Sequence, residues 1–198
     1  MNYLRLNLQQ KKIAIKLTET SDNKILELCR NEDSLNFGFD LLVKKYQQRV
    51  YWQVRKMVID HNDTDDLVQD IFIKIWKNLD SFREDAKLFT WIYRIATNEV
   101  LSFLNRKKRR YFLSLSSYED HLYDKLQDDH FFTGDDIQKK FQKALLKLPP
   151  KQRLVFNMKY YEELKYNEIS EILGTSVGAL KASYHHAVKK IKDFVTDN

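Results

Sequence analysis

Residues 166–194 read YNEISEILGTSVGALKASYHHAVKKIKDF. Apolar side chains recur in this stretch at the spacing of one helix face, first before and then after a short turn. These apolar positions are Ile169, Ile172, Leu173, Leu180, Tyr184, Ala187 and Ile191. Gly174 can adopt the left-handed backbone conformation that ends a helix, and Ser176 can cap the next helix. Two helices joined by so short a turn predict a helix-turn-helix, whose second helix enters the major groove of DNA.

The opposite side of the second helix is polar and basic. It carries Gly178, Lys181, Ala182, His185 and Lys189. Lysines at such positions can reach phosphates or base edges. An ordinary helical corner with a solvated basic face would carry the same charges. The short turn and the basic face occur together, however, and this combination favours DNA binding.

The composition favours helices and excludes several classes of protein. The chain has 198 residues, a net charge of +6, four Gly and two Pro, whereas sheet-rich folds need more turn residues. The single cysteine, Cys29, rules out an internal disulfide and fits a reducing compartment. No apolar run resembles a transmembrane helix or a secretory signal. We therefore expect an all-α protein in the cytoplasm.

The helical pattern divides the chain into two small domains joined by a flexible acidic linker. Helical periodicity covers residues 22–110 and returns over 137–198. Between them, residues 111–136 hold seven acidic residues and one lysine, and the periodicity is lost. Residues 1–21 form an N-terminal extension of alternating apolar and polar residues, which fits a small hairpin or an unstructured leader.

The same periodicity places the individual helices. In the first domain we expect a long helix from about Ser34 to Ile59, a second helix capped by Asp63 or Thr64, and a third from Leu88 to Leu104. The predicted helices of the second domain are 137–148, 151–161, 167–173 and 176–195.

Aromatic and basic residues alternate near the end of the first domain. The rings are Phe82, Phe89, Trp91, Tyr93 and Phe103, and the polar residues among them are Arg83, Lys87, Arg94, Asn98, Arg106 and Lys107. Unpaired bases stack on rings while cations hold phosphates, so this mixture suits single-stranded nucleic acid. The alternative, which helical spacing alone favours, is that most of these rings belong to the core.

Four acidic residues cluster at the start of the predicted second helix: Asp63, Asp65, Asp66 and Asp70. Capping and the helix dipole account for acids at this end of a helix, and a metal site would need further converging ligands. The better interpretation is a protein-docking face, in which Asp66, Gln69 and Asp70 meet a basic partner. Phe72 and Trp76 would anchor the contact.

The sequence offers no chemistry of the kind an enzyme needs. It has no nucleophile paired with a base, no glycine-rich phosphate loop and no Cys/His metal motif. His185 and His186 are adjacent and point different ways on a helix, so they are poor joint ligands. We therefore predict no catalytic residue, no bound metal and no cofactor.

Three motifs, in this order, resemble the extracytoplasmic-function (ECF) sigma factors of bacterial RNA polymerase. DTDDLVQDIFIKIWKNLDSF is similar to the helix of that family that binds polymerase and faces the promoter, and FREDAKLFTWIYRIATNEVLSFLNRKKRR to its promoter-melting segment. The stretch from ALLKLPPKQR to VKKIK is similar to its C-terminal domain. The resemblance implies a chain that directs core RNA polymerase to promoters and catalyses no reaction itself.

The resemblance also implies roles for particular residues. The region of Asp66, Gln69, Asp70, Phe72 and Trp76 would dock on the clamp helices of the polymerase. The residues implied in binding the unpaired non-template strand of the minus-ten element are Phe82, Arg83, Lys87, Trp91, Tyr93, Asn98, Arg106 and Lys107. The residues implied in reading the minus-35 duplex are Ser176, Gly178, Lys181, Ser183, His185, His186, Lys189 and Lys190. Many members of the family have arginine where this chain has Ser183, and often where it has His186.

The resemblance implies further partners. The acidic linker would run toward the RNA exit path and the flap region of the polymerase, and an anti-sigma factor would sequester the chain. The main alternative is a helix-turn-helix activator or repressor that is not a polymerase subunit. That alternative explains residues 141–195 and leaves the aromatic and basic segment at 82–110 without a role. A nuclease using Asp65, Asp66 and Asp70 lacks the converging ligands that it would need.

Overall fold

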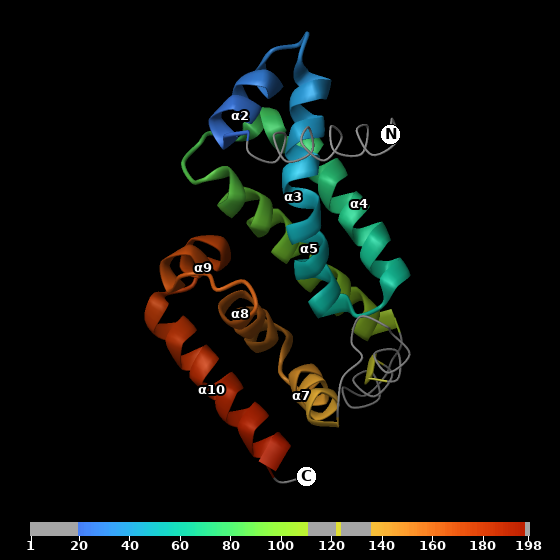
Figure 1. The fold of residues 1–198 in the computed structure, drawn as a ribbon, viewed down its shortest axis with the longest axis vertical. Coiled ribbons are helices and arrows are strands. Elements are labelled where there is room, and N and C mark those ends of the chain that lie inside the picture. The colour runs from blue at the N-terminus through green and yellow to red at the C-terminus, as the bar shows by residue number, and fades with distance from the viewer. Residues whose placement is uncertain (1–19, 111–121, 124–135, 197–198) are drawn as a thin grey trace, which may run out of the picture.

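The computed structural model describes residues 20–110, 122–123 and 136–196, and every regular element in these ranges is helical. The first region contains α2 (Asp22–Arg30), α3 (Leu35–Val58), α4 (His61–Asn78), the short 3₁₀ turn η1 (Leu79–Ser81) and α5 (Leu88–Arg110) (Figure 1). The second region contains α7 (Asp136–Leu146), α8 (Pro150–Tyr160), α9 (Tyr166–Leu173) and α10 (Val177–Thr196). The predicted all-α fold class is confirmed. The N-terminal extension and most of the acidic linker lie outside the described residues.

Local capping explains where α2 and α4 begin. The hydroxyl of Ser21 accepts a hydrogen bond from the Lys24 backbone N–H at 3.3 Å, at the start of α2. The carboxylate of Asp60 accepts from the Asp63 N–H at 2.8 Å and caps α4. The prediction that Asp63 or Thr64 caps this helix is wrong, because α4 already begins at His61.

The basic run at the end of the first region is helical. The predicted end of this helix near Leu104 is wrong, because α5 continues through RKKRR to Arg110. Lys and Arg are good helix formers, and neither Gly nor Pro interrupts the run. The basic side chains therefore extend from a regular helix rather than from a loop.

The core of the first region lies between α3, α4 and α5. Its fully buried members include Val50, Val54, Ile71, Ile75, Ile92 and Val100. Helix α2 packs against the start of α3, where Gly38 lets the two backbones approach closely. A Cβ atom added at Gly38 would lie 2.8 Å from the backbone N of Cys29, so only glycine fits there.

The second region contains the predicted helix-turn-helix. Gly174 has φ 61° and ends α9 in the left-handed conformation. The hydroxyl of Ser176 accepts a hydrogen bond from the Ala179 N–H at 3.3 Å and caps the start of α10. Leu180, Ala187 and Ile191 form the buried stripe of α10, as the sequence spacing predicts. Pro149 and Pro150 separate α7 from α8 and open the latter.

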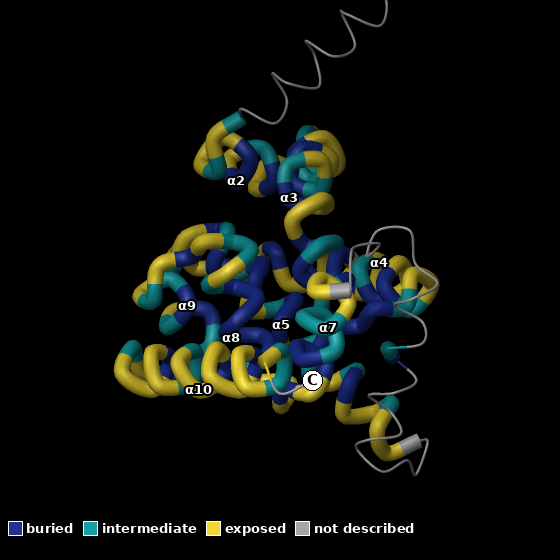
Figure 2. Tube along the Cα trace, turned by 60° about the horizontal axis from the view of Figure 1, so that its bottom comes forward, coloured by how far each residue is buried: buried dark blue, intermediate teal, exposed yellow. Residues whose placement is uncertain are grey.

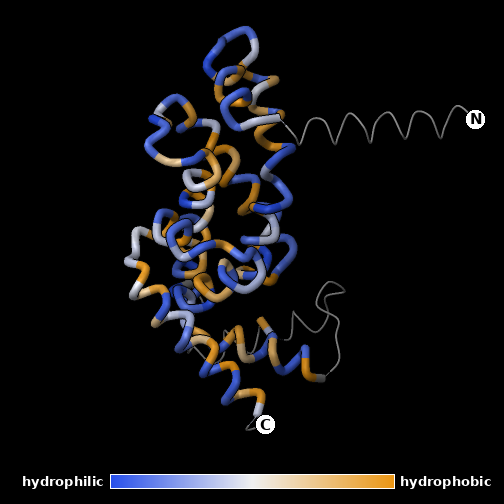
Figure 3. Tube along the Cα trace, turned by 60° about the vertical axis from the view of Figure 1, so that its left-hand side comes forward, coloured by the Kyte–Doolittle hydropathy of each residue, from blue (hydrophilic) through white to orange (hydrophobic). Residues whose placement is uncertain are grey.

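The two regions pack against each other, which the sequence did not predict. Helix α8 contacts α3, and α9 contacts α5. Buried residues of α8 and α9 belong to the same apolar cluster as the core of the first region. Figure 2 shows the buried tube of α8 between the exposed outer side of α10 and the first region, and Figure 3 shows hydrophobic and hydrophilic residues alternating along the helices. None of the helices in the described ranges is long and apolar enough to cross a membrane.

Candidate functional site

One face of α4 presents an exposed stripe of acidic and apolar side chains. Asp66, Gln69, Asp70, Ile73 and Trp76 are all exposed, and their spacing places them along one side of the helix. Ile73 is 44% exposed and Trp76 is 38% exposed, which is unusual for side chains of this size. The Trp76 ring meets the Phe39 ring edge-on, with centroids 4.7 Å apart, so it is held in place at the surface. We call these five residues the docking stripe.

The structure corrects one predicted member of the docking face. Phe72 is only 9% exposed and packs in the core with Ile71 and Ile75. The prediction that Phe72 anchors a contact is therefore wrong, because its ring is already covered by the protein. Ile73 holds the exposed position instead. The spacing from Asp66 and Gln69 could have identified it, since residues three, four and seven apart share a face.

The remaining acids of this helix make local contacts. The Asp63 carboxylate pairs with the Lys107 ammonium at 2.7 Å, which ties the start of α4 to the end of α5. Asp65 lies 3.6 Å from the imidazole of His61. Within residues 20–110, 122–123 and 136–196, no group of three or more His, Cys, Asp or Glu side chains could hold a metal ion.

The residues predicted to bind unpaired bases divide into exposed and buried sets. Arg83, Lys87, Asn98 and Arg106 are exposed, and Trp91 and Lys107 are half-buried. Phe82 is 8% exposed, and its ring lies 5.0 Å from that of Trp91. The loop that joins η1 to α5 thus has charged residues outside and an aromatic pair beneath. An ion pair between Arg30 and Glu84 links this loop to α2.

Tyr93 is a core residue, so the prediction that it meets a base is wrong for this conformation. It is fully buried, its ring lies 4.1 Å from the Phe89 ring, and burial raises the pKa of its hydroxyl. The Arg49 guanidinium covers the neighbouring Phe89 ring at 4.5 Å. Lys107 is also occupied, by its pair with Asp63. Asn98 keeps an exposed side chain on a polar face of α5 that continues to Ser102 and Arg106.

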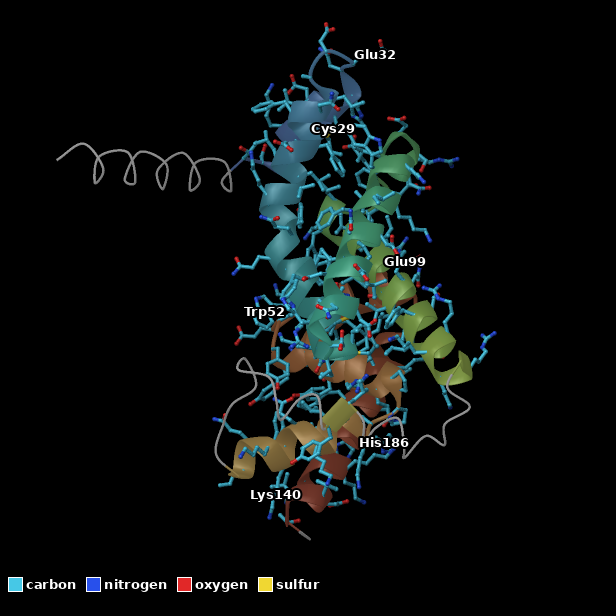
Figure 4. The ribbon with its side chains drawn as sticks, turned by 90° about the vertical axis from the view of Figure 1, so that its right-hand side faces the viewer. Cys29, Glu32, Trp52, Glu99, Lys140 and His186 are labelled. Atoms are coloured by element: carbon cyan, nitrogen blue, oxygen red, sulfur yellow. The ribbon has the colours of Figure 1, made fainter. Side chains whose placement is uncertain are left out.

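The predicted duplex-reading face of α10 is open. Gly178, Lys181, His185, His186, Lys189 and Lys190 are exposed, Ser176 is exposed at the helix start, and Ser183 is half-buried. The Lys181 ammonium lies 5.9 Å from the centroid of the Tyr166 ring. Lys190 donates to the side-chain oxygen of Gln152 at 3.2 Å. Figure 4 shows His186 on the outer side of the second region.

Family models match the two regions separately. The model of Sigma-70 region 2 matches residues 42–110, and the model of Sigma-70, region 4 matches residues 138–191. The first match covers the docking stripe and the aromatic and basic segment of α5. The second match covers the helix-turn-helix. Together the two matches span more than half of the chain.

Related proteins cover almost the whole length of the chain. The ECF RNA polymerase sigma factor SigW of Bacillus subtilis (strain 168) is 30% identical over 168 residues, which are 81% of this chain and 90% of that protein. The ECF RNA polymerase sigma-E factor of Escherichia coli (strain K12) is 27% identical over 185 residues, which are 89% of this chain and 95% of that protein.

Solved structures share the fold. The sigma factor RpoE in complex with the anti-sigma factor NepR from Bartonella quintana has a TM-score of 0.60 and 20% identity, and the match covers 80% of this chain and 96% of that one. CnrH in complex with the cytosolic domain of CnrY has a TM-score of 0.60 and 22% identity, with 93% and 96% covered. The two matched regions, their order and the similarity to SigW show that this chain belongs to the ECF RNA polymerase sigma factors.

Proposed function

We propose that this chain recruits core RNA polymerase through the docking stripe of α4 and reads promoters through α5 and α10. The observation that carries the proposal is that two different faces are exposed on the two regions of the chain. The docking stripe of α4 is acidic and apolar, whereas the outer face of α10 is basic. As a sigma factor it catalyses no reaction itself, and we place its action in the cytoplasm, where core polymerase is found.

Binding to polymerase would rest on the docking stripe. Asp66 and Asp70 offer carboxylates to a basic surface such as the clamp helices, and Ile73 and Trp76 offer apolar area to bury. Large aromatic side chains such as Trp76 are over-represented among the residues that contribute most to binding at protein interfaces. The charges would guide association, while the two apolar side chains would slow dissociation.

Promoter opening would use the loop before α5 and the exposed face of α5. Arg83, Lys87 and Arg106 can hold phosphates of the unpaired non-template strand. The Asn98 amide offers both donors and an acceptor to an exposed base edge. Trp91 is half-buried against Phe82, and a base would stack on the exposed part of its ring face.

Recognition of the upstream duplex would use α10. Its N-terminal half, from Ser176 to His186, would lie in the major groove, as recognition helices do. Lys189 and Lys190 would then lie near the phosphate backbone. Ser183 and His186 stand where many family members carry arginine, so this chain should prefer a different minus-35 sequence from those members.

The proposed function also implies a protein inhibitor of this chain. RpoE and CnrH, which share this fold, were solved with the anti-sigma factor NepR and with the cytosolic domain of CnrY respectively. We therefore propose that an anti-sigma factor sequesters this chain by covering its exposed interfaces. The acidic linker would, when released, follow the RNA exit path of the polymerase toward the flap region.

The experiment that tests the proposal is transcription in vitro with purified core polymerase on genomic DNA. New start sites should appear only when the full chain is added. Asp66→Lys together with Asp70→Lys should abolish binding to core polymerase in a pull-down. Lys181→Ala together with Lys189→Ala should preserve polymerase binding and weaken promoter use, with a salt slope lower by about one unit per lost phosphate contact.

The outcomes separate the proposal from its alternatives. A chain that binds specific duplex DNA but never binds core polymerase would be an activator or repressor. If both folded double variants lose both activities, then the division of labour between α4 and α10 is wrong.

A further inference from the structure

A cavity of about 210 Å³ lies between the end of α3 and the helices α7 and α8. Its lining includes Trp52, Lys56 and Ile59 from the first region, and Leu145 and Leu146 from α7. Figure 4 shows Trp52 on α3, next to the second region. An apolar cavity of about 150 Å³ is already large enough to bind benzene. The present cavity therefore has room for an aromatic ring with a short substituent.

Asn157 of α8 brings a polar atom without a partner into this lining. The residue lines the cavity and is 4% exposed. Its amide nitrogen donates to the Met57 sulfur at 3.5 Å, whereas its buried Oδ1 accepts no hydrogen bond from any residue that the structure describes. A buried acceptor that is left without a donor is destabilising. A molecule that donates an N–H or O–H to Oδ1 would remove that penalty.

The same lining carries a positive charge beside a phenol hydroxyl. The Lys56 ammonium lies 4.4 Å from the centroid of the Tyr161 ring, and both residues line the cavity. Burial lowers the pKa of Lys56, and the Glu162 carboxylate acts in the opposite direction. The Tyr161 hydroxyl accepts from the Gln142 amide at 3.3 Å, so its own hydrogen can be donated to a ligand. An ammonium and a hydroxyl in this arrangement suit a carboxylate.

The apolar part of the lining favours an organic molecule over water. Water would satisfy Asn157 Oδ1, but it would also wet the buried side chains of Ile59, Leu145 and Leu146. A flat ring covers these side chains without that penalty. The rings of Trp52 and Tyr161 add aromatic surface to the same lining. The cavity thus combines apolar walls with a few polar groups, as ligand sites do.

An adjoining cavity gives a ligand access to the first one. It has a volume of about 360 Å³ and shares Trp52, Lys56 and Tyr161 with the first cavity. Arg49, which also lines it, is exposed, so this cavity leads from the surface to the shared residues. Lys56 and Arg49 outnumber Glu162, the carboxylate in its lining, and the path therefore favours an anion.

We propose that the two adjoining cavities form a binding site for a small planar aromatic carboxylic acid that carries an N–H or O–H donor. Its ring lies against the apolar lining, its carboxylate meets Lys56 and the Tyr161 hydroxyl, and its donor meets Asn157 Oδ1. Because the lining comes from both regions, the bound acid joins them and stabilises the folded chain. The site uses neither the docking stripe nor the outer face of α10, so it is tested without polymerase or promoter.

The test is a calorimetric titration of the full chain with indoleacetate, which combines a planar ring, a carboxylate and one N–H. Saturable binding is expected, with a dissociation constant of roughly millimolar or tighter, as for other ligands of this size. The melting temperature of the chain should rise with the concentration of indoleacetate. Two comparison ligands each lack one group: N-methylindoleacetate has no N–H, and tryptophol has a hydroxyl in place of the carboxylate.

Each variant removes the partner of one group of the ligand. Asn157→Leu should weaken the binding of indoleacetate about fivefold, because one hydrogen bond is lost, and should not weaken that of N-methylindoleacetate. Lys56→Gln should weaken indoleacetate about tenfold and leave tryptophol unchanged, because only the acid uses the ammonium. The matched control is Lys44→Gln on the same helix, whose ammonium pairs with Asp40 at 3.4 Å. It removes the same charge and should leave all three affinities unchanged.

Absence of saturable indoleacetate binding would overturn the proposal. Equal losses of both acids in Asn157→Leu would also overturn it, as would equal losses of indoleacetate and tryptophol in Lys56→Gln, because the variant would then have changed the cavity in general. Circular dichroism checks that each variant is folded. Should Asn157→Leu unfold, the wild-type chain carries the same test, since it should bind N-methylindoleacetate about fivefold more weakly than indoleacetate. Equal affinity of the wild-type chain for the two acids would refute the contact with Asn157.

Discussion

Phe72 and Ile73 are neighbours in the sequence, and replacing each by alanine should give opposite phenotypes. Phe72 is 9% exposed and packs with Ile71 and Ile75, whereas Ile73 is 44% exposed on the docking stripe. Phe72→Ala should therefore cost stability without a specific binding defect. Ile73→Ala should cost polymerase binding without a stability defect.

The expected magnitudes follow from burial. Truncating a buried phenylalanine costs about 3–5 kcal/mol, because a cavity remains where the ring was. In a chain of this size that corresponds to a melting temperature lower by roughly 6–20 °C. Ile73→Ala at an exposed site should change the free energy of unfolding by no more than about 0.5 kcal/mol. If a partner buries roughly 60 Å² of the Ile73 side chain, its loss costs about 1.5 kcal/mol, or about tenfold in Kd.

Thermal unfolding of the free chain and titration against purified core polymerase measure the two effects separately. The Phe72→Ala titration is made well below its melting temperature, so that the folded fraction is the same for both variants. The assignment is refuted if Ile73→Ala lowers the melting temperature as far as Phe72→Ala does. It is also refuted if Phe72→Ala melts normally and loses polymerase binding.

Three further predictions concern packing, pH and promoter opening. Gly38→Ala should destabilise the chain by about 1–3 kcal/mol in urea unfolding, because the new methyl group would meet the backbone of Cys29 at 2.8 Å; Gly178→Ala, which meets nothing within 4 Å, should be neutral or slightly stabilising. Burial raises the pKa of Glu162 above its ordinary value of 4.5, against the opposing effect of the nearby Tyr93, Lys56 and Arg49. The folded chain therefore holds the Glu162 proton more tightly than the unfolded chain, so the free energy of unfolding should fall as the pH rises from 4.5 through the raised pKa of the folded state. Glu162→Gln cannot lose a proton, so its melting temperature should depend less on pH over the same range. Asn98→Ala should melt normally and impair promoter opening, as followed by permanganate reactivity of unpaired thymines, and normal opening on several promoters would exclude a base contact.

The sequence determined the features that depend on local chemistry. Gly174 and Ser176 mark the turn of the helix-turn-helix because a left-handed residue ends one helix and a hydroxyl caps the next. The buried stripe of α10 followed from apolar spacing alone. The start of α4 was less predictable, because Asp60 and Asp63 are both suitable capping residues. The end of α5 was less predictable, because the basic run is itself a good helix former.

The tertiary structure decided which members of each predicted site are available to a partner. Phe72 and Ile73 are both apolar and adjacent, and only the packing of α4 against its neighbours shows that the first is covered and the second is not. Tyr93 lies among residues that suit nucleic acid, yet Phe89 and Arg49 enclose it. The contact of Arg153 with Met57 joins residues far apart in the chain, and no local pattern records it. Helical periodicity describes one helix at a time. Burial, and the packing of the two regions against each other, depend on which faces of several helices come into contact.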